Sequence, residues 1–561
     1  MAICLPSIKS LQLQNFVGRI QNLAIDEISQ NIRFTSSKEC KVAGANQESV
    51  FLGLKQLVNE SERVIVADAS IDQTTLDFMQ EARPDEIFTI VEQIPRNSNR
   101  KCFLYGDRAD LLTQVTIELQ NGGNVWFSVE SAERAEVLKQ MFADDYDVLT
   151  ITSKNSKTKQ IKHFLENIEV ESRKYRMVIA SPAISSGVSV EHQKPLLDEN
   201  GRQVYDEKGK PVFVPDPHFT MIAGMASGHS ICFSDFAQML ARVRYVNHYH
   251  VCLKKNNHKY DGVTAHTILL GQRQAAMLEG AKLKENEYTQ VMAGIDERER
   301  AYRADFANGF IWFLQYYCFE ILPAPQTQMD YTLLDKLKEI TKENKQAYRQ
   351  ALCEADPINQ EQADKLDQKK DLTEDEQVTL MAFNIKKLLG YTHVHSLELL
   401  DIEMFERLPA IDRFARYLGL VPKVDDTDKN IALRKFANAQ VKATELMFGE
   451  YKLNDTFFTP EICKKIVKNV CSNDNRFMFS ALKLVPSSYA RDIQDKQGNL
   501  KPLRVPDNCS KSMGAILEKF GLKWKRHTKG HSRNGNIGYQ VNEESFEIMK
   551  KYALQRYAHQ A

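Results

Sequence analysis

The chain has 561 residues, too many for one hydrophobic core, so its length predicts three or four domains. Its 74 Lys+Arg and 74 Asp+Glu residues cancel, so any DNA-binding surface must come from local clustering of charge. Ten cysteines include no C-x-x-C pair, which argues against a zinc ribbon or redox dithiol and fits a reduced cytoplasm. We find no signal-peptide pattern, and the most apolar stretch, 310–322, is too short to span a bilayer and is expected to be a buried helix.

Residues 1–290 alternate short apolar runs with helical patterns, as expected for parallel strands that are buried on both faces. One of these helices is predicted to begin after Ser131, which can cap it, with Glu133 in the first turn. This alternation predicts a parallel α/β sheet. The predicted strands are 23–25, 64–67, 102–105, 125–129, 148–152, 177–180 and 220–223.

Residues 192–217 interrupt this alternation. Two turn signals, at 200–201 and 208–209, predict a β-hairpin insertion. No internal repeat is apparent in the chain.

After about residue 290 the sequence becomes mostly helical, with one face formed by Leu333, Leu334, Leu337 and Ile340. The polar stretch 356–371 is expected to be a linker or an exposed helix, and Thr373 with Glu376 predicts a new helix start. A short helix, 511–520, is followed by two β-prone runs, 522–524 and 537–541, on either side of a basic loop. Helix, strand, basic loop and strand are the elements of a winged-helix module.

The first segment with chemical potential is the apolar run 23–25 followed by Asp26 and Glu27. This is the Walker B pattern, in which the aspartate at the strand tip holds Mg²⁺ and the glutamate positions or activates a water molecule. A solvated helix start has the same pattern.

Two further segments follow strands. The strand 64–67 runs into Asp68, Ala69 and Ser70, a turn that can couple two faces of a nucleotide site, although an aspartate there can equally cap the next helix. The strand 177–180 leads into a loop whose hydroxyls and glycine can present donors to phosphate, although it can equally be an ordinary serine-rich loop. The donors in this loop are Ser185, Ser186 and Gly187.

The fourth segment, 234–244, is expected to be a helix capped by Ser234, with Gln238 and Arg242 on one face. An arginine held there can stabilise charge on a transferring γ-phosphate. Arg244 lies about 200° further round an ideal helix, so both arginines can face one phosphate only if the helix ends there. A surface helix with salt bridges is the alternative interpretation.

In this order, the four segments resemble motifs II, III, V and VI of superfamily 2 helicases, over about residues 5–250. The wording DEISQ, SPAISSGVS, HFTMIAG and QMLARVR is similar to the branch containing the herpesvirus origin-binding protein and related plasmid and phage replication proteins. The resemblance implies two RecA-like domains with ATP and DNA between them, Mg²⁺ held through ATP at Asp26, and no structural metal. It also implies that the segment 5–11, which includes Ser7, touches DNA.

One departure is important: the sequence has no G-x-x-x-x-G-K-[ST] phosphate loop, which the resemblance requires before residue 5. We therefore expect the C-terminal part of a longer or split helicase, which does not hydrolyse ATP alone. The expected organisation is a partial first RecA-like domain (1–98), a second RecA-like domain (99–290), a helical region (291–425) and a C-terminal module (426–561), winged-helix-like at about 505–561.

The first functional hypothesis is a cytoplasmic DNA replication helicase or origin-binding protein. Its partners would be DNA and the missing helicase half or other replication proteins, with no membrane. The second is a non-enzymatic DNA-binding or partner-binding replication factor. A nuclease is disfavoured because no Asp/Glu/His cluster has metal-ligand spacing. Under the first hypothesis the catalytic residues are Asp26, Glu27, Gln238, Arg242 and Arg244, and basic residues of the C-terminal loop add duplex affinity. These basic residues are Lys525, Arg526, Lys529 and Arg533.

Overall fold

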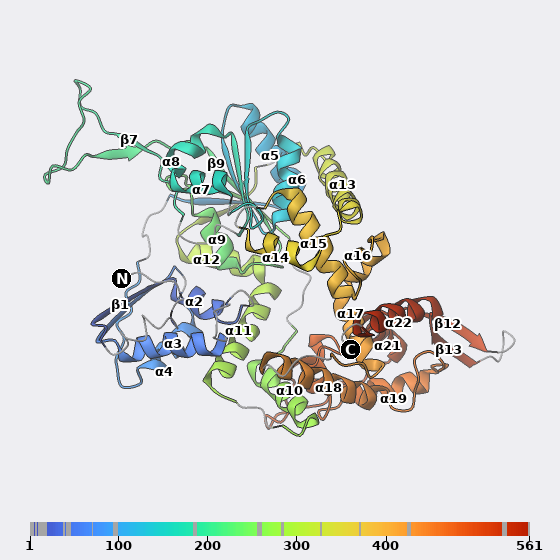
Figure 1. Cartoon of the computed structure of the whole chain (residues 1–561). Helices are drawn as coiled ribbons and strands as arrows, with labels where there is room; N and C mark the ends of the chain where they lie inside the picture. Colours follow the sequence, from blue (N-terminus) through green and yellow to red (C-terminus); the bar gives the residue numbers. More distant parts are fainter. Residues whose placement is uncertain are drawn as a thin grey trace.

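The structure is a computed structural model in which three parts follow one another along the chain (Figure 1). An N-terminal unit contains a two-stranded parallel sheet, a larger domain contains a seven-stranded parallel sheet, and the rest is mainly helical with a small antiparallel hairpin. The expected α/β class followed by a helical region and a small α+β module is confirmed. The described residues are 5, 8, 19–37, 40, 47–69, 71–93, 99–156, 158–182, 188–254, 261–281, 285–325, 328–369, 372–422, 428–529 and 536–558.

The N-terminal unit is built on two paired strands. They run parallel, with Asp26 opposite Ala67 at their carboxyl ends, and burial alternates along both. Helices pack on one face of the pair and bury a core that includes Phe51 and Phe78, and Ile295 from a later helix completes this core. The elements are β1 (Asn22–Asp26), α2 (Ile28–Phe34), α3 (Gln47–Glu60), β2 (Arg63–Ala67), α4 (Gln73–Ala82) and the later helix α11 (Glu287–Ala304).

The larger domain has all seven strands parallel, in the order β11-β3-β10-β9-β4-β6-β5. Its central strands are buried along their whole length, as continuous apolar runs in a parallel sheet should be. The strands are β3 (Lys101–Tyr105), β4 (Val125–Val129), β5 (Val148–Ile151), β6 (Met177–Ala180), β9 (Met221–Ala226), β10 (His248–Leu253) and β11 (Glu320–Pro323).

Helices cover both faces of this sheet. One face packs on α7 (Lys159–Glu166), α9 (Phe233–Leu240) and α12 (Phe306–Tyr316). The other face packs on α5 (Arg108–Gln120) and α6 (Ala132–Phe142), and the long helix α13 (Thr332–Glu354) lies against these two. Ser131 caps α6 as expected, by accepting the Arg134 N–H at 3.3 Å.

Gly224 on β9 allows α9 to pack unusually close to the sheet. A Cβ atom at this position would lie 2.8 Å from the Phe236 ring and 2.9 Å from a Leu240 methyl group, closer than van der Waals contact permits. The sheet therefore fixes the position of α9, the helix that carries Gln238.

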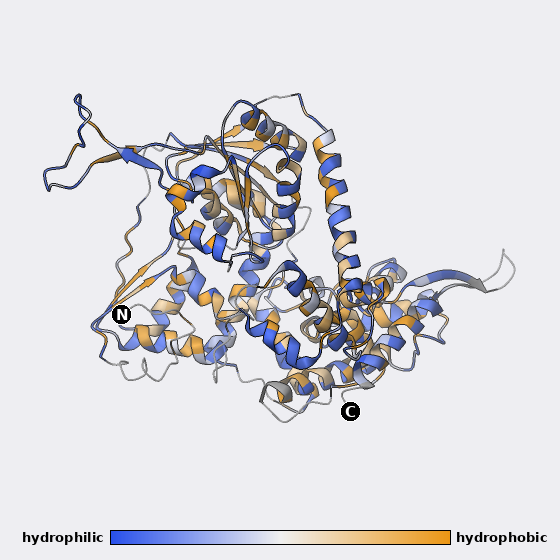
Figure 2. Ribbon diagram, turned by 45° about the horizontal axis from the view of Figure 1, so that its top comes forward, coloured by the Kyte–Doolittle hydropathy of each residue, from blue (hydrophilic) through white to orange (hydrophobic). Residues whose placement is uncertain are grey.

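The expected hairpin insertion is confirmed as an arm that projects from the body (Figures 1 and 2). Its base consists of the antiparallel strands β7 (Gln193–Pro195) and β8 (Phe213–Pro215). The two predicted turns contain Gly201 and Gly209, both with positive φ.

The prediction that 310–322 forms one buried helix is wrong. Helix α12 ends at Tyr316, Cys318 takes a left-handed conformation with φ 61°, and the chain continues as β11. Trp312 is 60% exposed, because only one side of α12 faces the sheet. A uniformly apolar run has no periodicity from which this change could be read.

The remaining helices share one large core. The expected face of α13, formed by Leu333, Leu334, Leu337 and Ile340, packs against the seven-stranded domain. The polar stretch 356–371 contains the exposed helix α14, and Thr373 and Glu376 form a capping box at the start of α15. These and further helices are α10 (Ala265–Leu278), α14 (Gln360–Gln368), α15 (Glu374–Leu389), α16 (Leu399–Glu406), α17 (Leu408–Tyr417), α18 (Asp428–Phe448), α19 (Pro460–Cys471), α20 (Arg476–Ala481), α21 (Cys509–Lys519) and α22 (Glu543–Ala558); a short helix, α8 (Ile168–Glu171), follows α7.

The C-terminal hairpin pairs β12 (Trp524–Lys529) with β13 (Asn536–Val541) in antiparallel fashion. Phe458 adds a third strand contact by bridging to Tyr539 on β13, with N–H···O distances of 2.9 and 3.0 Å. The helix α21 precedes the hairpin and packs on α19. Within the described parts of the chain, no helix has the length and apolar character needed to cross a membrane.

Candidate functional site

The carboxyl end of β1 brings Asp26 and Glu27 to the junction between the N-terminal unit and the larger domain. Asp26 is exposed, and one of its oxygens accepts the Glu27 N–H at 3.1 Å. Glu27 has a left-handed backbone, with φ 51°, and stands directly before α2. The sharp turn at Glu27 separates the two carboxylates, one at the strand tip and one at the helix start.

Asp68, at the end of β2, holds the start of α2. Its carboxylate accepts the Ser29 N–H at 2.9 Å and also the Ser29 hydroxyl. It does not cap the helix that follows it in sequence, because Asp72 does so by accepting the Thr75 N–H at 3.0 Å. Asp68 therefore connects the turn after β2 to the segment that carries Glu27.

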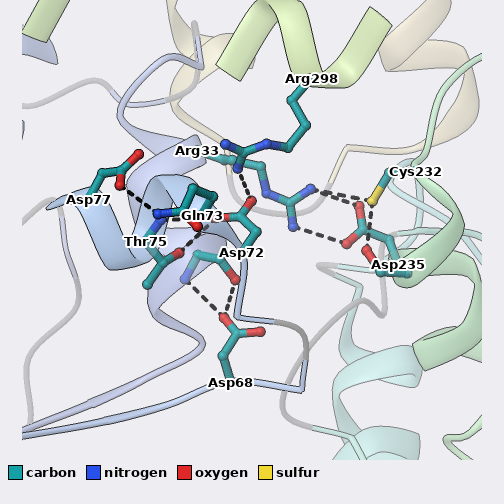
Figure 3. A network of polar contacts seen from close by, with 11 residues as sticks. Arg33, Asp68, Asp72, Gln73, Thr75, Asp77, Cys232, Asp235 and Arg298 are labelled. Carbon is teal, nitrogen blue, oxygen red and sulfur yellow. Dashed lines mark hydrogen bonds and ion pairs between the residues drawn. The ribbon is translucent and has the colours of Figure 1, made fainter. Parts of the chain in front are cut away.

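A chain of side-chain hydrogen bonds crosses the junction. The Gln30 amide donates to Glu27 at 3.2 Å and to the Gln238 side-chain oxygen at 3.1 Å. Arg33, one turn later on α2, donates to Asp235 at 3.1 Å and contacts the Cys232 sulfur (Figure 3). Neither Gln30 nor Arg33 was predicted as a site residue, although Gln30 closes the DEISQ segment.

A second ion pair reinforces the junction from α11. Arg298 pairs with Asp72, the residue that caps α4 (Figure 3). The N-terminal unit is thus held both by α9 and by α11.

The prediction that Gln238 and Arg242 share a helix face is wrong. Helix α9 ends at Leu240, and its N-terminal cap is Cys232, so Ser234 lies in the first turn instead of capping it. The helix stops because the next residues form backbone hydrogen bonds with Val190 instead of with the helix. The Val190 N–H donates to the Arg242 carbonyl at 2.8 Å, and the Val190 carbonyl accepts the Arg244 N–H at 2.9 Å. Because the helix ends before Arg242, helix geometry no longer prevents Arg242 and Arg244 from facing the same site.

The side chains of both arginines are anchored on the end of the third predicted motif. Arg242 donates to the Val188 carbonyl at 3.1 Å, and the Arg244 Nε donates to the Ser189 hydroxyl at 3.1 Å. The loop 188–190 and the segment 242–244 are thus joined by both backbone and side-chain hydrogen bonds.

Electrostatics couples Glu27 to Arg242. Burial raises the pKa of Glu27, the charges of Asp68 and Asp26 raise it further, and Arg242 acts in the opposite direction. Burial lowers the pKa of Arg242, with a smaller contribution from Arg244, while Glu27 opposes this shift. A carboxylate with a raised pKa is a better proton acceptor than an ordinary glutamate, which suits the activation of water.

Left-handed backbone occurs at Glu27 and at three residues that precede neighbouring strands of the larger sheet: Asn99 before β3, Tyr245 before β10 and Cys318 before β11. All four are left-handed, with φ between 44° and 62°, and among the described non-glycine residues only Lys483 shares this conformation. Such residues cost about 1–3 kcal/mol each and tend to occur at functional sites.

The remaining predicted site residues lie partly within and partly outside the residues that the structure describes. Ala69 is described, and its carbonyl accepts the Tyr317 hydroxyl at 2.7 Å. Lys525 and Arg526 are exposed on β12. In both views the β12–β13 hairpin and the arm project from opposite ends of the molecule (Figures 1 and 2). Outside the described residues lie Ser7, Ser70, Ser185, Ser186, Gly187 and Arg533, and the side chain of Lys529.

The residues at the junction fit a Mg²⁺–nucleotide only in part. Asp26 offers an exposed carboxylate at the strand tip, and Mg²⁺ on a nucleotide needs only one or two protein carboxylates besides phosphate oxygens. The described residues contain no group of three or more His, Cys, Asp or Glu able to hold a metal ion. The phosphate-cradling G-x-x-x-x-G-K-[ST] pattern is the part that the sequence lacks.

No protein-family model and no curated protein sequence matches the chain. Among solved structures, S. cerevisiae Dbp5 bound to RNA and ADP BeF3 is similar at 9% identity and a TM-score of 0.30, over 58% of this chain and 64% of that one. A Dbp5 variant in the same complex matches at 10% identity and a TM-score of 0.29, also over 58% of this chain and 64% of that one. This chain thus spans less than two thirds of these Dbp5 chains, and likenesses this distant carry no argument about function.

Proposed function

We propose that the chain is a helicase-type protein that couples ATP to remodelling of DNA in replication, with its nucleotide site at the junction of two RecA-like units. The observation that carries this proposal is the hydrogen-bonded chain Glu27–Gln30–Gln238 across the junction. It joins two segments, 208 residues apart, that were singled out separately as Walker B-like and arginine-bearing.

In this proposal each residue has a distinct role. Asp26 would hold Mg²⁺, and Glu27, with its raised pKa, would accept a proton from the attacking water. Arg242 would stabilise charge on the γ-phosphate, and Arg244 would keep the loop 188–190 in place through Ser189. Bound ATP with Mg²⁺ would supply the phosphoryl group that is transferred.

A second candidate is a DNA-binding replication factor without ATPase activity. One specific observation favours it: no segment of the sequence matches the phosphate loop. Under this candidate the junction would be a fixed structural contact, and the C-terminal hairpin would provide most of the affinity for DNA.

DNA-stimulated ATP hydrolysis by the chain, supplied with a P-loop-bearing helicase fragment in trans, separates the two candidates. If the chain turns over ATP, Arg242→Ala should lower kcat by about 10³-fold or more while the fold remains intact. Arg63→Ala is the matched control, because this exposed arginine lies at the opposite end of β2 and should leave turnover unchanged. Unchanged turnover in Arg242→Ala would contradict the catalytic assignment, and DNA binding without turnover supports the second candidate.

The C-terminal module supports a DNA contact under both candidates. The order α19, α21, β12 and β13, with the bridge from Phe458, is consistent with a winged-helix-like module that has a basic hairpin. Replacing Lys525, Arg526, Lys529 and Arg533 by Ala should reduce the slope of log affinity against log salt by about 3 to 4. An unchanged slope would exclude the hairpin as a phosphate-binding element.

A further inference from the structure

The projecting arm is built from an eight-residue repeat, so the prediction that the chain has no internal repeat is wrong. The first unit is KPLLDENG (194–201), the second is RQVYDEKG (202–209), and the third begins with KPVF (210–213). The unit is short and its two complete copies are identical at only three of eight positions, so the repeat becomes evident only when the turns are seen to be equivalent.

The two turns of the repeat have the same hydrogen bonds. Asp198 accepts the N–H groups of Asn200 and Arg202, both at 2.8 Å. Asp206 accepts those of Lys208 and Lys210 at 2.9 and 2.8 Å. The aspartates of the two turns therefore occupy equivalent positions, and each carboxylate accepts hydrogen bonds from backbone N–H groups of its own turn.

Main-chain hydrogen bonds bring the three units together around one axis. Leu196 donates to Val212 at 2.9 Å, Val204 donates to Leu196 at 2.8 Å, and Val212 donates to Val204 at 2.9 Å. The three side chains are half-buried against one another, so the next residue of each unit projects outward.

These outward residues form what we call the apolar cap: Leu197, Tyr205 and Phe213. They remain 54%, 60% and 49% exposed, respectively. Near them, Arg202, Lys208 and Lys210 make no ion pair with any residue that the structure describes. The cap thus offers two aromatic rings, each with a basic residue three positions earlier in its repeat.

The base of the arm is fixed to the candidate nucleotide site. Val190 is paired with the segment that carries Arg242 and Arg244, and Gln193 donates to the Tyr245 hydroxyl at 2.5 Å. His192 is buried and accepts the His218 N–H at 3.3 Å. The base of the arm is therefore hydrogen-bonded to the segment that carries Arg242 and Arg244.

We propose that the apolar cap binds single-stranded nucleic acid by stacking unpaired bases on Tyr205 and Phe213. This site lies outside the proposed ATP function and does not depend on it. Aromatic side chains are sequence-tolerant platforms for bases, and the neighbouring cations can reach the adjoining phosphates.

Two observations favour nucleic acid over a protein partner. Three half-exposed side chains offer on the order of 300 Å², whereas a stable interface buries about 800 Å² on each partner. The aromatic residues also alternate with unpaired cations. Over residues 194–213, however, four basic residues balance four acidic ones, so stacking and not net charge must supply the affinity. The salt dependence at this site should consequently be weak.

The test compares the full chain with Tyr205→Ala/Phe213→Ala, without nucleotide, on a fluorescent single-stranded oligonucleotide and on its duplex. The variant should bind the single strand at least about tenfold more weakly and the duplex equally well, with an unchanged salt slope. Tyr205→Phe keeps the ring and should bind like the wild type.

An effect below twofold on the single strand would overturn the proposal. So would concentration-dependent self-association, measured by sedimentation, that disappears in the double variant, because it would assign the cap to a second copy of the chain. Failure of ATP turnover has no bearing on this result, since no nucleotide is present. Thermal unfolding of the variant should match that of the wild type, because both side chains are exposed.

Discussion

The two parallel sheets have strands of similar composition but very different surroundings. In β1 and β2 exposed and half-buried residues alternate, and Ile65 remains 69% exposed. In β4 and β6 every residue is buried. Burial is therefore set by the number of neighbouring strands and by the covering helices, and not by the composition of the strand itself.

The candidate catalytic carboxylates and the large buried clusters therefore lie on different sheets. The carboxylates of the candidate site lie on the sheet with little cover, and its core depends on Ile295 from α11 and on the ion pair between Arg298 and Asp72. The seven-stranded sheet carries large buried clusters on both faces. We expect β1 and β2 to open locally well before β4 and β6.

The largest effect should come from Phe127→Ala, in the centre of β4. Phe127 is fully buried, so its loss should lower the free energy of unfolding by about 3–5 kcal/mol. The matched control, Ile65→Ala on β2, should change it by less than about 0.5 kcal/mol. Urea denaturation of both variants measures the difference, and equal costs would remove the distinction between the sheets.

An intermediate effect is expected at the junction. Arg33→Ala, Asp235→Ala and the double variant form a mutant cycle across the two units, whose side chains are 3.1 Å apart. We expect a coupling energy of about 1–2 kcal/mol, together with faster amide exchange in β1 and β2 and unchanged exchange in β4. Additive single variants would mean that this ion pair does not hold the unit in place.

The smallest effect concerns pH. Because the pKa of Glu27 is raised above its usual 4.5, the folded chain holds this proton more tightly than the unfolded chain. Its contribution to stability is present below the unfolded pKa and is lost as pH rises through the folded pKa. Glu27→Gln should therefore gain stability relative to the wild type from pH 4 to pH 7 in urea titrations. A difference that stays constant with pH would contradict the assigned environment.

The buried strands of the fold were predictable because continuous apolar runs specify them. β4 and β6 have the predicted bounds. By contrast, β10 was missed because His248 and His250 alternate with Tyr249 and resemble a polar loop. The second histidine is half-buried beside Tyr105, to which it is hydrogen-bonded at 2.8 Å, a tertiary contact that no local pattern contains.

The residues of the candidate site remain a prediction, and their geometry was not contained in the sequence. Glu27 and Gln238 are joined only through Gln30, which was not foreseen. The segment QMLARVR favours helix locally, and α9 nevertheless ends at Leu240, because Val190 supplies competing backbone hydrogen bonds. A contact across 52 residues decided a boundary that propensity alone would have placed later.

Gly224 connects the packing of the seven-stranded sheet to the position of the Glu27 carboxylate in the other unit. Since the Phe236 and Leu240 side chains of α9 pack directly on Gly224 of β9, the seven-stranded sheet positions Gln238, and Gln238 is joined to Glu27 through Gln30. A side chain at position 224 would overlap the Phe236 ring and the Leu240 methyl group, so either these side chains or α9 itself would have to shift, and a shift of α9 would reach the carboxylate in the other unit. The absence of a side chain at position 224 thus affects how Gln238 of the larger domain and Glu27 of the N-terminal unit align.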